Sequence, residues 1–339
     1  MRDEPATSHP ISLIPDPSFL IPNLSSLIPD SMHSVYQRIQ SYIHRTPILT
    51  SKTLDELSGA TLFFKCENFQ KMGAFKMRGA ANAILQLSEE ERRNGVATHS
   101  SGNFAQALAL SAQMLGVPAY IVMPSNSPEV KKAAVRGYGG EIIECAPSLA
   151  AREETLAQVV ARTGAVFIHP FNDGNVIMGQ GTAAFELLQD VDNLDIIVSP
   201  VGGGGLLSGT ALAAKALSPL TKVWAAEPAG AADAWESKKA GKIIPQTNAQ
   251  TIADGLRTSL GDKTWPIIRD HVERVVLVEE NEIVAALRLL MERMKIVVEP
   301  SGAVALAAVL KETKSLAGKR VGVILSGGNV DIKAIAALL

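Results

Sequence analysis

Short apolar runs alternate with longer amphipathic stretches along most of the chain. The runs are rich in β-branched residues and predict buried strands over residues 96–99, 119–122, 141–144, 165–168, 195–198, 222–226, 274–278 and 319–325. Between several of these runs, apolar residues recur at helical spacing, over 103–115, 128–137 and 148–163. Such alternation implies parallel sheets covered by helices on both faces. The number of strands favours two α/β domains, with a barrel as the structural alternative.

The first thirty residues follow a different pattern. A Leu-Ile-Pro-Asn/Asp tetrapeptide recurs every seven residues, at 13–16, 20–23 and 27–30. A coiled coil is excluded because the proline in each heptad removes a helix hydrogen bond. A secretory signal is also excluded, because the segment has neither a basic leader nor an unbroken apolar stretch. We therefore expect residues 1–30 to form an extended or disordered tail, with a folded unit beginning near Met32.

Composition and charge narrow the class of protein. A length of 339 residues allows about two domains, and 32 Lys and Arg against 34 Asp and Glu give a net charge of −2. This balance provides no basic face for nucleic acid, and no apolar run is long enough to predict a membrane span. Two cysteines, Cys66 and Cys145, build neither a disulfide framework nor a cysteine zinc site. We expect a reducing, cytoplasmic compartment.

Four consecutive glycines between Val201 and Leu206 provide the strongest local signal. They follow a predicted strand and precede a predicted helix, so their unhindered N–H groups meet the positive end of the helix dipole. This arrangement predicts a phosphate-binding loop. The spacing fits neither a Walker loop nor a dinucleotide fingerprint. The alternative is a flexible turn.

Lys76 stands between Phe75 and Met77, at the start of an apolar helical stretch. Desolvation and the helix dipole both disfavour an ammonium group in that position, and this frees the amine for Schiff-base chemistry. The alternative is an ordinary surface lysine at the start of a helix.

Two polar turns follow predicted strands. Ser100, Ser101, Gly102 and Asn103 open a helix, where hydroxyl and backbone donors form a binding site for a carboxylate. The alternative there is a plain helix cap. Ser326 similarly ends the strand near the C-terminus and precedes two glycines. Ligands of open α/β sheets bind at that end of the strands.

Together these segments resemble the fold-type II pyridoxal-phosphate enzymes, in the group of the serine/threonine dehydratases and serine racemases. The resemblance runs from about Met32 to the end, and it includes FKCENFQ at 64–70, MP at 123–124, GQGT at 179–182, TIADG at 251–255, TWPII at 264–268 and RMKI at 293–296. It implies a fold like that of the tryptophan synthase β subunit, with two open parallel or mixed sheets and helices on both faces. The implied large cofactor-binding domain covers 31–94 and 172–339, and the small mobile domain covers 95–171. A homodimer is also implied.

The resemblance further implies which residues hold the cofactor, pyridoxal 5′-phosphate. Lys76 would bind it as a Schiff base. The residues expected around the ring are Phe75, Asn103 (at the 3-oxygen), Glu299 and Ser326 (at the pyridine nitrogen). The residues expected at the phosphate are Gly202, Gly203, Gly204, Gly205 and Leu206.

The resemblance also implies how an amino-acid substrate is held. Its carboxylate would bind Ser100, Ser101 and Asn103, and Arg152 would approach the substrate when the small domain closes. Lys76 would take the α-proton from one face, and Ser101 would serve as the acid or base of the opposite face. The alternative for Arg152 is a solvated charge on a helix.

A divalent cation is implied at Glu227, Ala231 and Asp233. In the racemase-like branch, two carboxylates and a backbone carbonyl at this spacing bind the ion. All-oxygen ligands suit Mg²⁺, Ca²⁺ or Mn²⁺, with water completing the shell. From the residues alone, two acids six positions apart near a strand end are often only a capping pair.

One position departs from the family pattern and leaves the substrate open. Phe104 stands where a histidine usually follows the Ser-Ser-Gly-Asn motif. The sequence favours dehydration of L-serine or L-threonine to a 2-oxo acid and ammonia. The alternatives are racemisation of serine and dehydration of threo-3-hydroxyaspartate, for which the sequence shows no second cationic subsite. The presence of Lys76, Ser101 and a full phosphate loop argues against a non-catalytic carrier of the cofactor.

Overall fold

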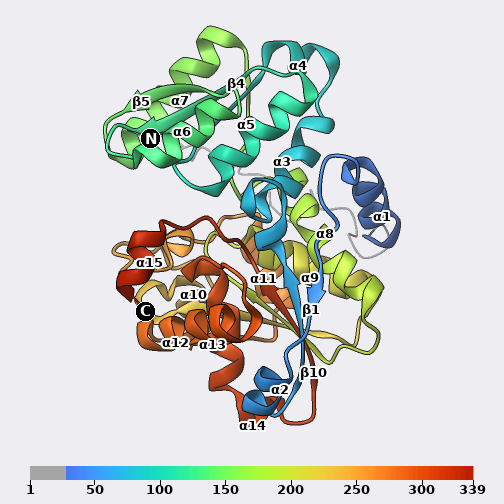
Figure 1. Ribbon diagram of the computed structural model, residues 1–339. Coiled ribbons are helices and arrows are strands. Elements are labelled where there is room, and N and C mark those ends of the chain that lie inside the picture. Colours follow the sequence, from blue (N-terminus) through green and yellow to red (C-terminus); the bar gives the residue numbers. More distant parts are fainter. Residues whose placement is uncertain (1–27, 339) are drawn as a thin grey trace, which may run out of the picture.

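Two sheets with helices packed on their faces make up the structure, a computed structural model that describes residues 28–338 (Figure 1). The large sheet contains, in spatial order, β1 (Ile48–Leu49), β2 (Thr61–Cys66), β10 (Arg320–Leu325), β7 (Ile196–Pro200), β8 (Lys222–Pro228) and β9 (Arg274–Val278). The small sheet contains β5 (Glu141–Cys145), β4 (Ala119–Pro124), β3 (Val96–His99) and β6 (Val166–Phe167). β1 pairs antiparallel with β2, and the other ladders of both sheets are parallel.

The helices follow the strands in the order expected for parallel sheets. They are α1 (Ile28–Ile39), α2 (Lys52–Ser58), α3 (Lys76–Leu85), α4 (Glu89–Asn94), α5 (Asn103–Leu115), α6 (Glu129–Gly137), α7 (Leu149–Thr163), α8 (Gly174–Asp190), α9 (Gly205–Leu217), α10 (Asp233–Ala240), α11 (Thr264–His271), α12 (Glu280–Leu289), α13 (Pro300–Lys311), α14 (Thr313–Leu316) and α15 (Ile332–Leu338). Shorter helical turns lie at η3 (Glu67–Phe69), η4 (Lys71–Gly73), η5 (Ala229–Ala231), η6 (Asp254–Leu256) and η7 (Leu290–Met294).

Separate cores bury the two faces of the large sheet. One core joins the sheet to α2, α12 and α13, and the other joins it to α8, α9 and α11. The small sheet is covered by α5 on one face, in a core that also includes α3, and by α7 in another core. Parallel strands that are buried on both faces read as continuous apolar runs, and all five residues of β7 are buried.

A buried ion network fixes the beginning of α3. Arg78 donates to the Glu67 carboxylate at 2.7 Å and to the Glu186 carboxylate at 2.8 Å, and Lys65 donates to Glu186 at 2.5 Å. All four charged side chains are 0% exposed. Thr46 adds a hydroxyl bond to Glu67 and a carbonyl for Lys65. With two positive and two negative groups fully paired, the network ties α3 to β2 and α8.

The fold confirms the predicted class, and all of the predicted strands and helices are found to within about two residues at their ends. The strands β1 and β2 are additional to the prediction. The expectation of an extended tail to residue 30 is wrong at residues 28–30, which belong to the first turn of α1. Residues 1–27, where the rest of that tail was predicted, lie outside the described residues.

The division into a large domain (31–94 and 172–339) and a small domain (95–171) remains a prediction. The small sheet takes its strands from residues 96–167, but α3 packs against α5 as well as against α8. In Figure 1 α3 lies between the two sheets. No helix between residues 28 and 338 is both long and apolar enough to cross a lipid bilayer.

Candidate active site

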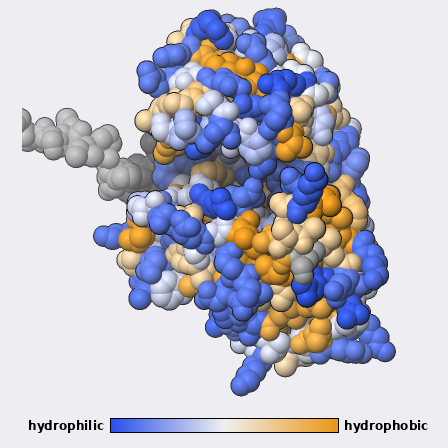
Figure 2. Space-filling view, turned by 60° about the vertical axis from the view of Figure 1, so that its left-hand side comes forward, coloured by the Kyte–Doolittle hydropathy of each residue, from blue (hydrophilic) through white to orange (hydrophobic). Residues whose placement is uncertain are grey.

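A cavity of about 1160 Å³ lies between the two sheets. In Figure 2 a hollow separates the upper and lower parts of the molecule. The cavity is lined by the ends of strands from both sheets and by the turns that follow them. The predicted cofactor and substrate residues all line it: Phe75, Lys76, Ser100, Ser101, Asn103, Arg152, Gly202, Gly203, Gly204, Gly205, Leu206, Glu299 and Ser326. The structure therefore brings these residues to one place, and the role of each remains a prediction.

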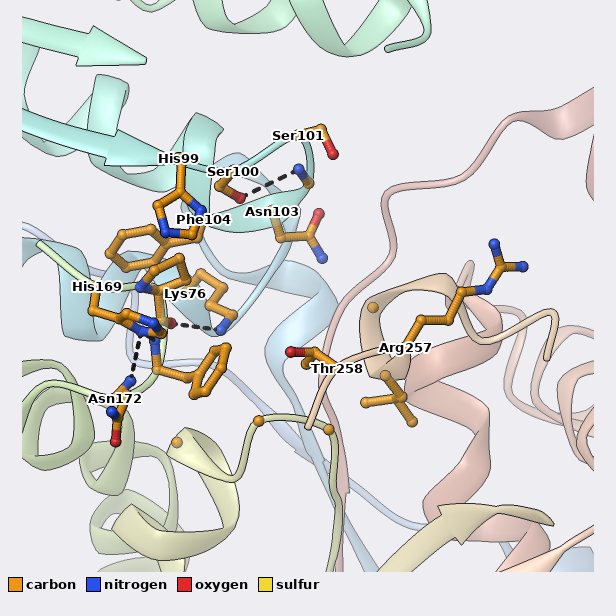
Figure 3. Close-up of a pocket in the computed structure, with 18 of the residues that line it drawn as sticks. Lys76, His99, Ser100, Ser101, Asn103, Phe104, His169, Asn172, Arg257 and Thr258 are labelled. Atoms are coloured by element: carbon orange, nitrogen blue, oxygen red, sulfur yellow. Dashed lines mark hydrogen bonds between the residues drawn. The ribbon is translucent and has the colours of Figure 1, made fainter. Parts of the chain in front are cut away.

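Lys76 is half-buried at the N-terminus of α3, between two aromatic rings. Its Nζ lies 5.0 Å from the centre of the Phe75 ring and 5.7 Å from that of Phe104, and it donates a 2.8 Å hydrogen bond to the Pro170 carbonyl (Figure 3). Burial lowers the pKa of Lys76 to about 8, although the Glu299 carboxylate opposes this shift. An amine with this pKa is partly neutral near pH 7, which suits a nucleophile or a general base.

The four glycines form a tight loop at the N-terminus of α9. Gly204 has φ 90°, in the left-handed region that favours glycine. A Cβ on Gly203 would lie 2.4 Å from the Phe171 ring, so no larger residue fits there. The loop thus presents backbone N–H groups to the cavity at a helix N-terminus, where the dipole attracts anions. A phosphate group fits this cradle.

Ser326 and Asn103 are suited to the polar atoms of a pyridine ring in different ways. Ser326 is buried at the end of β10, and its hydroxyl makes no hydrogen bond within residues 28–338. It is therefore available to a ligand nitrogen. Asn103 already bridges the two sheets, because its Nδ2 donates to both Glu299 oxygens at 3.0 and 3.1 Å. Its Oδ1 accepts from Asn329 at 2.9 Å. Burial raises the pKa of Glu299 to about 7.

The turn between β3 and α5 supplies donors for an anionic substrate group. Ser100 accepts a bond from the Gly102 N–H at 3.4 Å, and the Ser101 side chain makes no hydrogen bond within the described chain. Figure 3 shows both hydroxyls on the turn above Asn103. The turn precedes a 13-residue helix, so its free N–H groups lie at the positive end of a dipole. A carboxylate would be stabilised there.

Arg152 differs from the other cations of the cavity wall. Lys131 forms a 2.9 Å ion pair with Asp254, and Arg257 donates to the Thr251 carbonyl. The Arg152 side chain has no such partner among the residues described, and its Nε is buried without a hydrogen bond. An unpaired, partly desolvated guanidinium is a strong binding group for a carboxylate.

The candidate cation ligands follow β8 and do not themselves line this cavity. Both Glu227 oxygens accept backbone N–H bonds from the first turn of α10, at 2.7 and 2.9 Å. Asp233 Oδ2 accepts from the Leu260 N–H at 2.9 Å, and Asp233 Oδ1 is buried without a partner. Burial raises the pKa of Glu227 to about 8 and that of Asp233 to about 6. An orphaned carboxylate oxygen beside a second buried carboxylate fits an oxygen-ligated cation.

Residues 28–338 hold no cluster of three or more His, Cys, Asp or Glu side chains that could bind a metal. A cation at this position would therefore also need the carbonyl of Ala231, a buried residue of η5, and water. Both cysteines are free and buried.

Sequence reasoning missed the histidines of the cavity wall. His99 and His169 have ring centres 6.0 Å apart in an edge-to-face arrangement. Burial lowers the pKa of His99, with a further contribution from Arg152, and burial lowers the pKa of His169 to about 4. Each follows or ends a strand of the small sheet, and that position at the carboxyl end of a parallel strand was a usable signal.

Comparison with known proteins gives consistent matches over most of the chain. The family model described as pyridoxal-phosphate dependent enzyme matches residues 39–327. A β-hydroxyaspartate dehydratase from Paracoccus denitrificans is 52% identical over 303 residues, which is 89% of this chain and 96% of that protein. A serine racemase from Arabidopsis thaliana is 52% identical over 310 residues, covering 90% of this chain and 94% of that protein.

A solved structure extends this similarity to the fold. The crystal structure of serine racemase from Dictyostelium discoideum has a TM-score of 0.87 and 50% sequence identity to this chain. The similarity covers 89% of this chain and 98% of that one.

Proposed function

Because this chain belongs to the family of pyridoxal-phosphate dependent enzymes, we propose that it dehydrates 3-hydroxyaspartate, yielding a 2-oxo acid and ammonia. The sequence favoured serine or threonine as the substrate, and this expectation is confirmed only at the level of a lyase or racemase family. Dehydration removes the β-hydroxyl as water. Water then replaces the nitrogen, which leaves as ammonia.

The chain's own residues fit the cofactor. The free Ser326 hydroxyl, the glycine loop that a Cβ would fill, and the Lys76 amine suit the ring nitrogen, the phosphate and the aldehyde respectively. When bound, pyridoxal 5′-phosphate supplies an electron-accepting ring that stabilises negative charge at the substrate's α-carbon. A serine hydroxyl does not hold a pyridine nitrogen in its protonated form, so such charge is short-lived. This favours prompt loss of a β-substituent.

Lys76 and the β3–α5 turn would perform the steps that belong to the protein. The turn binds the α-carboxylate through its hydroxyl and N–H donors and so orients the α-hydrogen. The Lys76 amine, with its lowered pKa, accepts that proton on one face. The rings of Phe75 and Phe104 lie beside the amine and give it a partly apolar setting.

The unpaired Arg152 side chain is the main support for 3-hydroxyaspartate as the substrate. 3-Hydroxyaspartate differs from serine by a second carboxylate, and burying that charge requires a cation. Arg152 supplies one on the small-sheet side of the cavity, without a competing ion pair. The name of the Paracoccus relative agrees with this choice.

Racemisation of serine is a second candidate, favoured by Ser101. A racemase needs a proton donor on the face opposite Lys76, and the Ser101 hydroxyl has no partner in the described chain. Both reactions begin with loss of the α-proton. Dehydration then expels the β-hydroxyl, whereas racemisation returns a proton to the α-carbon from the opposite face.

Incubation with L-threo-3-hydroxyaspartate, L-serine, D-serine and L-threonine tests the proposal, with 2-oxo acid and enantiomer ratio read together. We expect 2-oxo acid chiefly from hydroxyaspartate. Arg152→Leu should raise the KM for hydroxyaspartate by at least about tenfold, since a charge-assisted bond to a carboxylate is worth roughly 1.5–3 kcal/mol. The KM for serine should change little. Equal losses for both substrates, or racemised serine with inert hydroxyaspartate, would contradict the proposal.

We also propose that Glu227, Ala231 and Asp233 hold a divalent cation, on the support of the orphaned Asp233 oxygen. Assembly as a homodimer remains a prediction.

A further inference from the structure

The turn over residues 169–172 connects β6 of the small sheet to α8 and contacts two parts of the cavity at once. Its Pro170 carbonyl accepts the 2.8 Å hydrogen bond from Lys76, the only hydrogen bond of that amine within residues 28–338. Its Phe171 ring fills the space left by the missing side chain of Gly203. The shape of this turn therefore decides where the reactive amine is held (Figure 3).

His169 holds the middle of the turn. Its Nδ1 accepts the N–H of Phe171 at 3.3 Å and the N–H of Asn172 at 3.0 Å. The proton of the neutral ring must therefore be on Nε2. The ring also packs edge-on against Phe171, with the ring centres 4.5 Å apart. Because burial lowers the pKa of His169 to about 4, Nδ1 stays an acceptor at neutral pH.

The end of the turn is held by groups other than His169. The Asn172 amide donates to Asp262 at 2.5 Å and accepts from the Lys263 N–H at 2.9 Å. Asp173 caps α8 by accepting from the Val176 N–H at 3.0 Å. Removing His169 should therefore leave the β6–α8 connection folded and release chiefly the peptide groups between residues 169 and 172.

We propose that His169 is a positioning residue that, through Nδ1, orients the Pro170 carbonyl toward the Lys76 amine. By accepting this hydrogen bond, the Pro170 carbonyl holds the flexible Lys76 side chain in one direction, between the rings of Phe75 and Phe104. A reacting group that is displaced by about 1 Å can lose up to about a hundredfold in rate. This inference rests on the proposed binding of the cofactor by Lys76.

The test uses the full chain stripped of cofactor and follows the visible absorbance that develops on adding pyridoxal 5′-phosphate. His169→Leu should slow this attachment at least about tenfold, because the amine is no longer directed. His169→Asn should remain within about threefold of the parent rate, since Asn Oδ1 accepts the same backbone N–H group in an Asx turn. His99→Leu is the matched control: it removes the neighbouring imidazole, which makes no hydrogen bond within the described chain, and it should not slow attachment.

Pyridoxine 5′-phosphate separates amine positioning from pocket integrity, because it carries the phosphate and ring without the aldehyde. Its affinity, measured by calorimetry, should be the same within about threefold in the parent chain and in His169→Leu, since the phosphate loop is unchanged. Attachment at the parent rate in His169→Leu would overturn the inference. The inference would also be overturned if His169→Asn attached the cofactor as slowly as His169→Leu does. A loss of pyridoxine 5′-phosphate affinity in His169→Leu as large as its loss of attachment rate would overturn it too. None of these measurements uses an amino acid. Their outcome therefore does not depend on whether 3-hydroxyaspartate is the substrate.

Discussion

Lys76 shows which properties of a single residue can be predicted from its neighbours in sequence. Phe75 and Met77 predict an apolar setting, and the structure confirms it. The hydrogen bond to Pro170 could not be predicted, because it joins residues 94 positions apart. Phe104, the departure from the family pattern, is buried with its ring facing the same amine. An aromatic ring therefore lies beside the amine at the position where the family resemblance implied a histidine.

The pKa of Lys76 predicts how cofactor attachment depends on pH. Only the neutral amine attacks an aldehyde, so the rate should rise about tenfold per pH unit below pH 8 and level off above it. For an ordinary lysine in a peptide, the attachment rate would keep rising up to about pH 10.4. Stopped-flow absorbance of the cofactor-free chain checks this, with a free lysine derivative as the reference. A midpoint close to that of the free derivative would show that the amine is not desolvated.

Ser101 provides a test of the two faces of the substrate. Ser101→Ala should lose racemisation of serine and elimination from D-substrates by about a hundredfold, the lower range for a general acid or base. Elimination from L-substrates should fall by less than about threefold, because Lys76 acts on that side and the α-carboxylate keeps the Ser100 hydroxyl and the backbone N–H donors of the turn. Chiral chromatography and 2-oxo acid release measure the two outcomes. Equal losses for both enantiomers would show that Ser101 chiefly binds the carboxylate.

At the scale of elements, burial explains both the successful and the missed predictions. β7, β8 and β10 were predictable because strands buried on both faces read as apolar runs. β2 was missed because Lys65 interrupts its apolar run. Lys65 is tolerated inside the fold because Glu186 pairs with it from 121 residues away, and no local pattern contains that information. α1 was not predicted. It begins inside the segment expected to be an extended tail, and its first turn accommodates Pro29, because the first residues of a helix need no N–H donor.

The ion network beneath α3 should dominate the stability of that element. Glu186→Ala would leave Lys65 and Arg78 without one partner in a fully buried site, which typically costs about 3–5 kcal/mol. Urea unfolding measures the loss. Glu56→Ala is the matched control, because its pair with Lys52 is exposed and should contribute less than about 1 kcal/mol. If both variants lost less than about 1 kcal/mol of unfolding free energy, the buried ion pairs of Glu186 would not contribute as proposed.

At the scale of the whole molecule, the site depends on how the two sheets face each other. The carboxyl ends of the strands could be predicted as the place where a ligand binds. Ser100, His169 and Ser326 lie just after such strand ends and line the cavity. The contacts that bring the sheets together were not predictable. Asn103 reaches Glu299 across 196 residues and Lys131 reaches Asp254 across 123. These contacts depend on three-dimensional packing, which one sequence without its relatives does not encode locally.

The proposed cation should act on global stability. An ion that binds only the folded chain stabilises it by about 2.7 kcal/mol at a hundredfold excess over its Kd, so a chelator should lower the melting temperature. Mg²⁺ or Ca²⁺ should restore both melting and turnover. Asp233→Ala should abolish most of the chelator response while keeping the cofactor absorbance, because none of the three proposed ligands lines the cavity. Unchanged melting and turnover in protein shown to be metal-free by elemental analysis would exclude the cation site.

The most direct test of the account is release of 2-oxo acid from L-threo-3-hydroxyaspartate by the parent chain and by Lys76→Ala, with visible absorbance recorded for both. The parent chain should be yellow and release 2-oxo acid. Lys76→Ala should lose the absorbance of the attached cofactor, and its turnover should fall by about 10²–10⁴-fold or more, the contribution of a positioned general base. Lys76→Ala releasing 2-oxo acid at the parent rate would contradict the assignment of the site.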